Sequence, residues 1–346
     1  MRRIEIRANL PGFISNFVVD PLSPCTSVIS LTLSLLHHWT ATDVCPIFEE
    51  LPGLLEFYID AKHPNDAGIR QIIGDLLVYS SDSLTHVAFD SVPRLEASVV
   101  DTLVDSCPQL ASVKIFQMKK SLLAEEDDYS ITDDSIENMT IQLRNLRGIE
   151  LFDCVKLSTR SLQHIFENCM FLTSLTLHAL PNITNSAAVF VPETLPLLRT
   201  LNVVFCEGAG DVLMKKLVTA AVQLERIKII WTSVTDDTLT NLAEADCRNS
   251  LKQISLEMLF DVEGEGFRNV IDSCQSLRNV TFKHSSDLFT VNKIEDKVLD
   301  TYLKVFELPR LLCYSFPTQV SGHFRKYGMN VGRGVWRKNG DYTSQE

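Results

Sequence analysis

A short hydrophobic pattern, L-x-x-L-x-L, recurs along the chain and constrains its fold more than any other feature. It is clearest at Leu172, Leu175 and Leu177. Copies open at positions 1, 28, 54, 84, 110, 146, 172, 198, 224, 251 and 277, so the intervals are 27, 26, 30, 26, 36, 26, 26, 26, 27 and 26 residues. A twelfth copy is expected around 311–316, because "ELPRLLCYSF" has the layout of "TLPLLRTLNV". Such a narrow distribution around 26 indicates a repeat protein.

Each copy predicts the same local structure. The alternation within L-x-x-L-x-L is typical of a short strand. An amphipathic stretch follows, as in "STRSLQHIFENC", where Leu162, Ile165 and Phe166 have helical spacing. One strand and one helix cannot enclose a core alone, but stacked units share one. The sequence therefore predicts an α/β solenoid, a horseshoe of about 12 strand–helix repeats with a parallel sheet on the concave face.

Seven of the nine cysteines occupy two equivalent places in the repeat. The first place is three residues before the residue that opens a copy, and it is occupied by Cys25, Cys107, Cys169 and Cys274, with Cys247 one residue earlier. The second is the ninth position of the copy, occupied by Cys154 and Cys206. No C-x-x-C pair occurs, and no histidine joins a cysteine at zinc-like spacing. We expect small buried packing residues, with the position-nine thiols bonded to neighbouring backbone. Redox or metal chemistry is the alternative.

The layout C-x-x-L-x-x-L-x-L-x-x-C, followed by a "T-D-x-x-L-x-x-L" helix start, resembles the cysteine-containing leucine-rich-repeat subfamily. The segments that carry the resemblance are "CMFLTSLTLHALPNIT", "SITDDSIENM", "SVTDDTLTNLA" and "NDAGIRQI", and it covers roughly residues 1–316. Members are mostly the substrate-binding halves of F-box proteins, which act in Skp–cullin ubiquitin ligases. The resemblance thus implies a substrate-recognition scaffold whose partners are a protein substrate, a Skp adaptor and a cullin.

An F-box precedes the repeats in that subfamily, whereas Met1 already lies in a repeat here. We expect either that the F-box lies on a preceding segment or that the protein never had one. The open N-terminal edge favours the first alternative, because terminal repeats usually carry a polar cap. In the second, the chain is a stand-alone regulator. A third alternative is a leucine-rich-repeat GTPase-activating protein for Ran, although that class has longer repeats and lacks this cysteine register.

The sequence contains no recognisable catalytic motif. The glycine-containing stretch "NVGRGVW" lacks the lysine and the following helix of a phosphate-binding loop, and neither G-x-S-x-G nor H-E-x-x-H occurs. The eight histidines are scattered. We therefore expect a protein that is not an enzyme and that needs no cofactor or metal.

Composition restricts the compartment and the class of partner. No apolar run approaches 18 residues, and "MRRIEIRANLPGF" does not resemble a signal peptide. Unpaired cysteines without a secretion signal favour the cytoplasm or the nucleus. The net charge of −12 argues against nucleic acid as the partner and leaves room for a local basic patch.

Function is expected where side chains point away from the helices, between and just after the strand leucines. The predicted partner-binding residues on this concave face are Tyr58, Phe116, Phe152, His178, Phe205, Arg226, Lys228, Trp231, Met258 and Lys283. Exposed aromatic and methionine side chains are common anchors of protein interfaces. Phe205 and Trp231 have an alternative placement beneath the turns. The basic residues suit an acidic or phosphorylated partner.

Two segments depart from the repeat. The copy at 110 carries an acidic insertion at about 119–134, expected to be a solvated loop or a docking loop. Beyond the repeat domain, 1–316, residues 317–346 are glycine-rich and basic. We expect this end to be a C-terminal cap or a flexible tail.

Overall fold

The computed structural model describes residues 2–8, 28–35, 41–61, 66–90, 92, 95–117, 131–259, 261–262, 265–284, 287–291, 334–336 and 342–344. The chain divides into two compact units, Met1–Leu198 (unit 1) and Arg199–Glu346 (unit 2). Each unit is built from alternating strands and helices.

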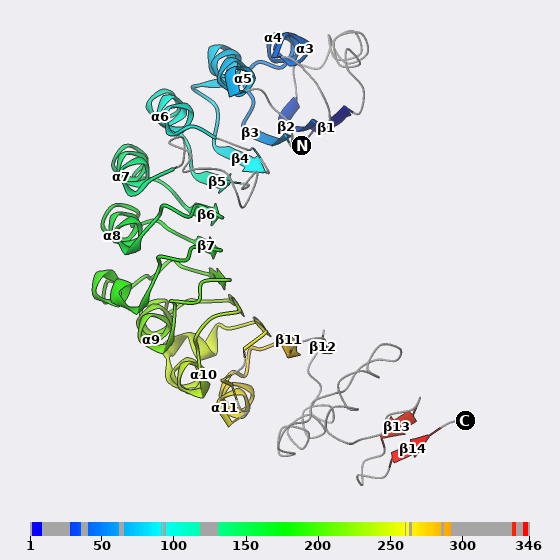
Figure 1. Ribbon diagram of the computed structural model, residues 1–346, viewed down its shortest axis with the longest axis vertical. Coiled ribbons are helices and arrows are strands. Elements are labelled where there is room, and N and C mark those ends of the chain that lie inside the picture. Colours follow the sequence, from blue (N-terminus) through cyan, green and yellow to red (C-terminus); the bar gives the residue numbers. More distant parts are fainter. Residues whose placement is uncertain are drawn as a thin grey trace, which may run out of the picture. The chain divides into compact units, whose positions relative to one another are not determined.

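Unit 1 contains a parallel sheet whose neighbouring strands follow one another in the sequence. Its strands are β1 (Arg2–Ala8), β2 (Val28–Leu35), β3 (Glu56–Ala61), β4 (His86–Asp90), β5 (Ser112–Phe116), β6 (Gly148–Phe152) and β7 (Ser174–His178). Its helices are α3 (Ala41–Val44), α4 (Pro46–Glu50), α5 (Asp66–Ser80), α6 (Ala97–Ser106), α7 (Asp133–Gln142), α8 (Thr159–Asn168) and the 3-10 helix η1 (Asn185–Phe190). Figure 1 shows α5 to α8 along one side of these strands.

Unit 2 repeats this arrangement. Its parallel strands are β8 (Thr200–Val204), β9 (Arg226–Ile230), β10 (Gln253–Glu257) and β11 (Asn279–His284), and β12 (Asp287–Val291) pairs antiparallel with β11. Its helices are α9 (Asp211–Ala220), α10 (Asp236–Glu244), η2 (Asp246–Asn249) and α11 (Glu265–Ser273). A separate antiparallel pair joins β13 (Gly334–Trp336) and β14 (Tyr342–Ser344).

The predicted strand of every copy from 1 to 277 is present, so the solenoid prediction is confirmed. The twelfth copy at Leu311, Tyr314 and Phe316 lies outside the described residues, as do most of the acidic insertion and the boundary at 316. Strand β12 was not expected, because its segment has no copy of the pattern. The division into two compact units was not anticipated either.

One repeat lacks the α-helix that its position predicts and has the 3-10 helix η1 instead. Prolines limit this segment, since Pro181 precedes it and Pro192 follows directly after Val191. A proline disfavours helical backbone in the residue before it, and Val191 is extended, with φ −69° and ψ 121°. The helix therefore ends after six residues.

The six described cysteines at the two repeat positions are buried packing residues, as predicted. Cys169 ends α8, where its N–H donates to the Ile165 carbonyl at 2.9 Å and its side chain is 2% exposed. Burial raises the pKa of its thiol to about 12. At position nine, the Cys154 and Cys206 thiols each donate to a strand carbonyl at 3.4 Å. Cys25 lies outside the described residues.

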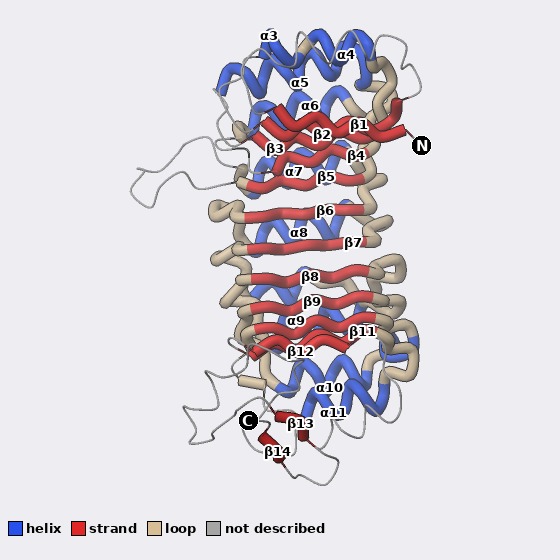
Figure 2. Tube along the Cα trace, turned by 90° about the vertical axis from the view of Figure 1, so that its right-hand side faces the viewer, coloured by secondary structure: helices blue, strands red, loops and turns tan. Residues whose placement is uncertain are grey.

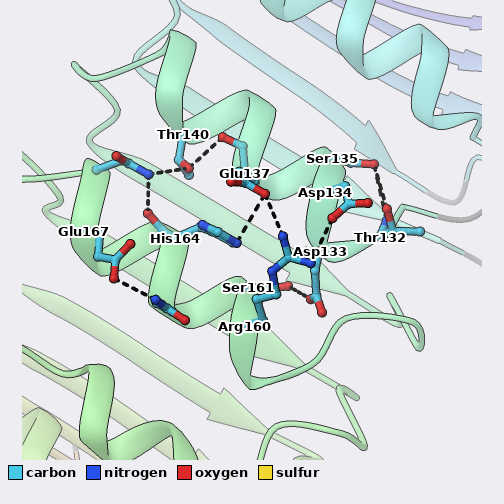
Figure 3. A network of polar contacts seen from close by, with 12 residues as sticks. Thr132, Asp133, Asp134, Ser135, Glu137, Thr140, Arg160, Ser161, His164 and Glu167 are labelled. Carbon is cyan, nitrogen blue, oxygen red and sulfur yellow. Dashed lines mark hydrogen bonds and ion pairs between the residues drawn. The ribbon is translucent and has the colours of Figure 1, made fainter.

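An aspartate at the first position of two helices fastens one repeat to the next. In unit 1, the Asp133 carboxylate accepts the Ser158 N–H at 2.9 Å and the hydroxyls of Ser158 and Ser161. Figure 3 shows Asp133 facing Ser161 across the contact between α7 and α8. In unit 2, Asp211 accepts from the backbone N–H and the hydroxyl of both Thr235 and Thr238. Each carboxylate thereby occupies the donors of the next helix start.

These contacts predict that the contribution of Asp133 to stability depends on pH. Burial acts to raise its pKa, but the hydrogen bonds from Ser158 and Ser161 and the charge of Arg160 lower it below its usual value. A carboxyl with a lowered folded pKa stabilises the protein above its unfolded pKa, about 3.9, and loses that effect as the pH falls further. Urea unfolding should therefore show the largest difference between wild type and Asp133→Asn near neutral pH, shrinking below about pH 4. A difference independent of pH contradicts this assignment.

Candidate protein-binding surface

In each unit, one face of the parallel sheet is covered by helices, and no described helix covers the other face. We call this second face the open face; Figure 2 shows strands β5 to β7 of unit 1 in front of α7 and α8, seen from this side. Side chains alternate between the faces of a strand. In β5, Ser112, Lys114 and Phe116 are partly exposed on the open face, whereas Val113 and Ile115 are buried against the helices. In β5, the positions predicted from the repeat are thus the ones that face outward.

Three predicted residues form a row on adjacent strands of unit 1. Phe116 pairs in register with Phe152, and Phe152 pairs with His178. Their ring centroids are 5.8 Å and 5.1 Å apart, respectively. The Lys114 ammonium lies 5.2 Å from the Phe152 ring and 2.7 Å from an Asp90 carboxylate oxygen. We call Phe116, Phe152 and His178 the aromatic row; it is half-buried. Lys114 is held beside it by the cation–π contact with Phe152 and by the ion pair with Asp90.

Tyr58 does not join the aromatic row, because its register partner on β4 is Ala88. It lies instead beneath Arg3, whose guanidinium carbon is 5.5 Å from the ring centroid. Arg3 also contacts the Glu56 carboxylate at 3.4 Å. Burial and the Glu56 charge raise the pKa of Tyr58. A second polar–aromatic cluster therefore lies on β1 to β3.

In unit 2, Phe205 and Trp231 form an exposed pair with centroids 6.1 Å apart. Their side chains are 44% and 39% exposed, so the alternative placement beneath the turns is not adopted. The indole N–H of Trp231 donates to Glu207 Oε1 at 3.0 Å, which fixes the ring. Met258 occupies the equivalent position after β10 and is half-buried. We call Phe205 and Trp231 the aromatic pair.

The backbone explains why the aromatic pair points outward. Phe205 and Trp231 have φ values of 53° and 49°, in the left-handed region that L-residues rarely adopt. In this conformation the N–H of each residue still bonds to the neighbouring strand, at 2.8 Å for Phe205 to Ile230 O and 3.0 Å for Trp231 to Glu257 O. The chain can therefore leave the strand direction at these residues while the hydrogen bonds between neighbouring strands extend to them.

The predicted basic residues lie on β9 and β11. Arg226 and Lys228 are exposed on the open face of β9, alternating with buried Ile227 and Ile229. The Arg226 Nε donates to the Thr200 hydroxyl at 3.1 Å. Lys283 lies in β11, but its side chain is outside the described residues. The structure thus places two of the three cations together.

Five residues of these clusters were absent from the predicted set: Arg3, Glu56, Asp90, Lys114 and Glu207. The first four occupy open-face positions of the repeat, so the spacing identifies them, but nothing in a single strand indicates which will pair. Glu207 lies in a turn after position nine, where the pattern carries no signal.

Among the described residues, no group of three or more histidine, cysteine, aspartate or glutamate side chains is arranged to hold a metal ion. The Glu137 contacts with Arg160 at 2.9 Å and His164 at 3.6 Å join α7 to α8, on the helix side of the sheet (Figure 3). No described helix is long and apolar enough to cross a bilayer. The predicted absence of a cofactor and of catalysis stays a prediction.

Comparisons with known proteins support the fold. No protein-family model matches the chain, and no curated protein matches it. A chain in the crystal structure of the Rad7 and Elc1 complex in yeast is similar, with a TM-score of 0.55 and 16% identity over 82% of this chain and 76% of that chain. An internalin (inlF) from Listeria monocytogenes aligns with a TM-score of 0.39 and 15% identity, covering 76% and 63% of the two chains. The protein has the α/β fold of a leucine-rich-repeat solenoid.

Proposed function

We propose that the chain is a non-catalytic scaffold whose open face binds a protein, and that it acts as the substrate-recognition component of a Skp–cullin–F-box type ubiquitin ligase. The observation that carries the first part is the presence of aromatic side chains on the open face of unit 1 and of exposed aromatic side chains in the turns directly after β8 and β9 of unit 2. Exposed aromatic groups beside charged residues are common anchors of protein interfaces.

The packing of the repeats does not account for these side chains. The core is made by the alternate strand residues, such as Leu175 and Leu177, which are fully buried against the helices. The open-face residues Phe152 and Trp231 add little to that core, yet each is held in place by neighbouring contacts. Side chains fixed in this way lose less conformational entropy when a partner binds.

The ligase assignment rests on the resemblance of the repeats to those of F-box proteins. The similarity to a chain from a two-protein complex is consistent with a scaffold that works in an assembly, although at 16% identity it informs on the fold alone. In this assignment the open face holds the substrate, and an adaptor of the Skp class and a cullin contact an F-box outside the repeats.

The test is affinity purification of the tagged full chain from its native cells, followed by mass spectrometry. A double variant, Phe152→Ala with Trp231→Ala, removes one anchor from each unit. The matched control is Met170→Ala with Val212→Ala, which truncates exposed apolar side chains in the turn before β7 and on α9, away from the open face; they are 75% and 58% exposed.

We expect at least one protein to be lost, by tenfold or more, from the open-face variant and retained by the control. Co-purification of Skp and cullin subunits with all three proteins supports the ligase assignment. Their absence, with the substrate-like partner still dependent on Phe152 and Trp231, supports a stand-alone regulator. A set of partners unchanged by the open-face variant overturns the binding surface itself.

A further inference from the structure

The open face of unit 2 carries two exposed cations without a counter-ion among the described residues. Arg226 and Lys228 project from the same face of β9, and neither makes an ion pair there. On the open face of unit 1, by contrast, Arg3 is paired with Glu56 and Lys114 with Asp90. The described part of unit 2 therefore brings together two positive charges without neutralising them.

Their neighbours on the adjacent strands are neutral. Arg226 lies between Thr200 and Gln253, and Lys228 lies between Asn202 and Ser255. The carboxylate of Glu257 lies further along β10, where its Oε1 accepts from the Ser255 hydroxyl at 3.0 Å. These polar neighbours leave the repulsion between the two cations in place, and a bound anion would relieve it.

The carboxylate of Glu225 forms ion pairs with two other cations in the same part of the sheet. It lies just before β9 and contacts Lys252 at 2.9 Å and Arg199 at 2.6 Å. The hydrogen bonds from Lys252 and Arg199 lower the pKa of Glu225. Lys252 and Arg199, beside β9, are thus paired within the chain, whereas Arg226 and Lys228 on its open face have no ion-pair partner among the described residues.

The two residues of the aromatic pair lie in the turns directly after the neighbouring strands β8 and β9. The left-handed position that Phe205 and Trp231 occupy recurs in unit 1 at Asp153 and Ala179. Glycine, asparagine and aspartate adopt this conformation most readily, so the turn itself does not favour a large aromatic residue. Two consecutive repeats carry an exposed aromatic residue at this position. Stabilisation of the turn does not explain this choice, whereas contact with a partner does.

We propose that the open face of unit 2 binds an extended acidic segment of the partner protein, with two carboxylates at Arg226 and Lys228 and an apolar side chain against Phe205 and Trp231. This inference rests on the proposed function and names the chemistry of the partner. Residues two apart on a strand are separated by about 6.6 Å and point to the same side, and Trp231 follows in the turn directly after β9. An extended peptide with the pattern Glu-x-Glu-x-Leu presents its three side chains on one side in the matching order.

Charge favours a protein segment over nucleic acid. Binding to a phosphate backbone depends on several neutralised phosphates, whereas β9 offers two open-face cations and the chain has a net charge of −12. Stacking of bases on the aromatic pair is the competing mode of binding. A single-stranded oligonucleotide is therefore included in the test.

The experiment measures fluorescence anisotropy of labelled peptides with the full chain. The probes are a peptide with Glu-x-Glu-x-Leu, its Gln-x-Gln-x-Leu counterpart and an oligothymidylate. The charge variant is Arg226→Glu with Lys228→Glu, and its control is Lys215→Glu with Lys216→Glu, the same charge change at two exposed residues of α9. The aromatic variant is Trp231→Asn, and its control is Ala179→Asn, at the equivalent left-handed position of unit 1.

We expect the acidic peptide to bind at least tenfold more tightly than the amide peptide, and more weakly at high salt. The charge variant should abolish this preference and the α9 control should keep it within twofold. Trp231→Asn should weaken binding about tenfold while leaving the thermal midpoint unchanged or raised, since asparagine is less strained there. Ala179→Asn should bind like wild type.

Equal binding of the two peptides, an unaltered preference in the charge variant, or tighter binding of the oligonucleotide overturns the proposal. Affinity purification of the native partner with both variants separates this failure from failure of the proposed function. If the partner is retained by the charge variant and lost from the Phe152 and Trp231 variant, the open face binds protein by other chemistry. If neither variant loses it, the proposed function fails as well.

Discussion

Replacing Asp211 with alanine is expected to lower the free energy of unfolding by about 2–4 kcal/mol, because one carboxylate accepts four hydrogen bonds from the next repeat. Two of the donors are the backbone N–H groups of Thr235 and Thr238 at the start of α10, at 3.0 and 3.2 Å. Alanine leaves them without this acceptor. Urea unfolding followed by circular dichroism measures the change.

The control is Asp237→Ala, which removes an exposed aspartate from the first turn of α10. Its negative charge is favourable near a helix N-terminus, by about 0.3–1 kcal/mol, so a small loss is expected. Asp211→Asn should fall between the two, since the amide keeps one acceptor oxygen. Equal losses for Asp211→Ala and Asp237→Ala would show that the contact between repeats contributes nothing beyond helix electrostatics.

The second large effect is expected at Gly266, where α11 approaches α10. A Cβ at this position would lie 2.6 Å from the Asp236 carbonyl oxygen and 2.8 Å from the Leu239 Cβ. Glycine to alanine normally stabilises a helix interior by about 1 kcal/mol. Here we expect the opposite sign, a loss of roughly 1–3 kcal/mol, because the two helices must move apart.

Gly74 in α5 is the matched control, since nothing lies within 4 Å of its Cβ direction. Gly74→Ala should raise the free energy of unfolding by about 0.5–1 kcal/mol. Opposite signs for the two substitutions, measured by denaturant unfolding, would establish that Gly266 is required by helix packing. A gain at both positions would refute the close approach of α10 and α11.

The sequence predicts the repeated part of this fold well because packing enforces its period. Leu201 and Ile227 must enter the same core at the same register, so a constant spacing appears in the sequence and identifies the strands. The alternation then identifies the open face. Elements without an equivalent in other repeats, such as β12 and η1, leave no such period and were missed.

The site is less predictable than the fold, for a related reason. The spacing identifies Phe152 as an open-face residue and Trp231 as the residue directly after a strand, but their partners Lys114 and Glu207 come from other strands and turns. Which side chains meet depends on register and turn geometry, which are set by the whole unit. The exposure of Trp231 follows from a left-handed turn that the pattern does not encode.

The measurement that tests the central claim most directly is photo-crosslinking in the native cells, with a benzophenone amino acid placed at single positions of the full chain. Phe152 and Trp231 sample the open face of the two units, and Gln163 on α8 and Lys216 on α9 sample the helix side. We predict that a shared partner is captured from the open-face positions at several times the yield from the helix positions. Capture of that partner chiefly from Gln163 and Lys216 would contradict the assignment of the open face as the binding surface.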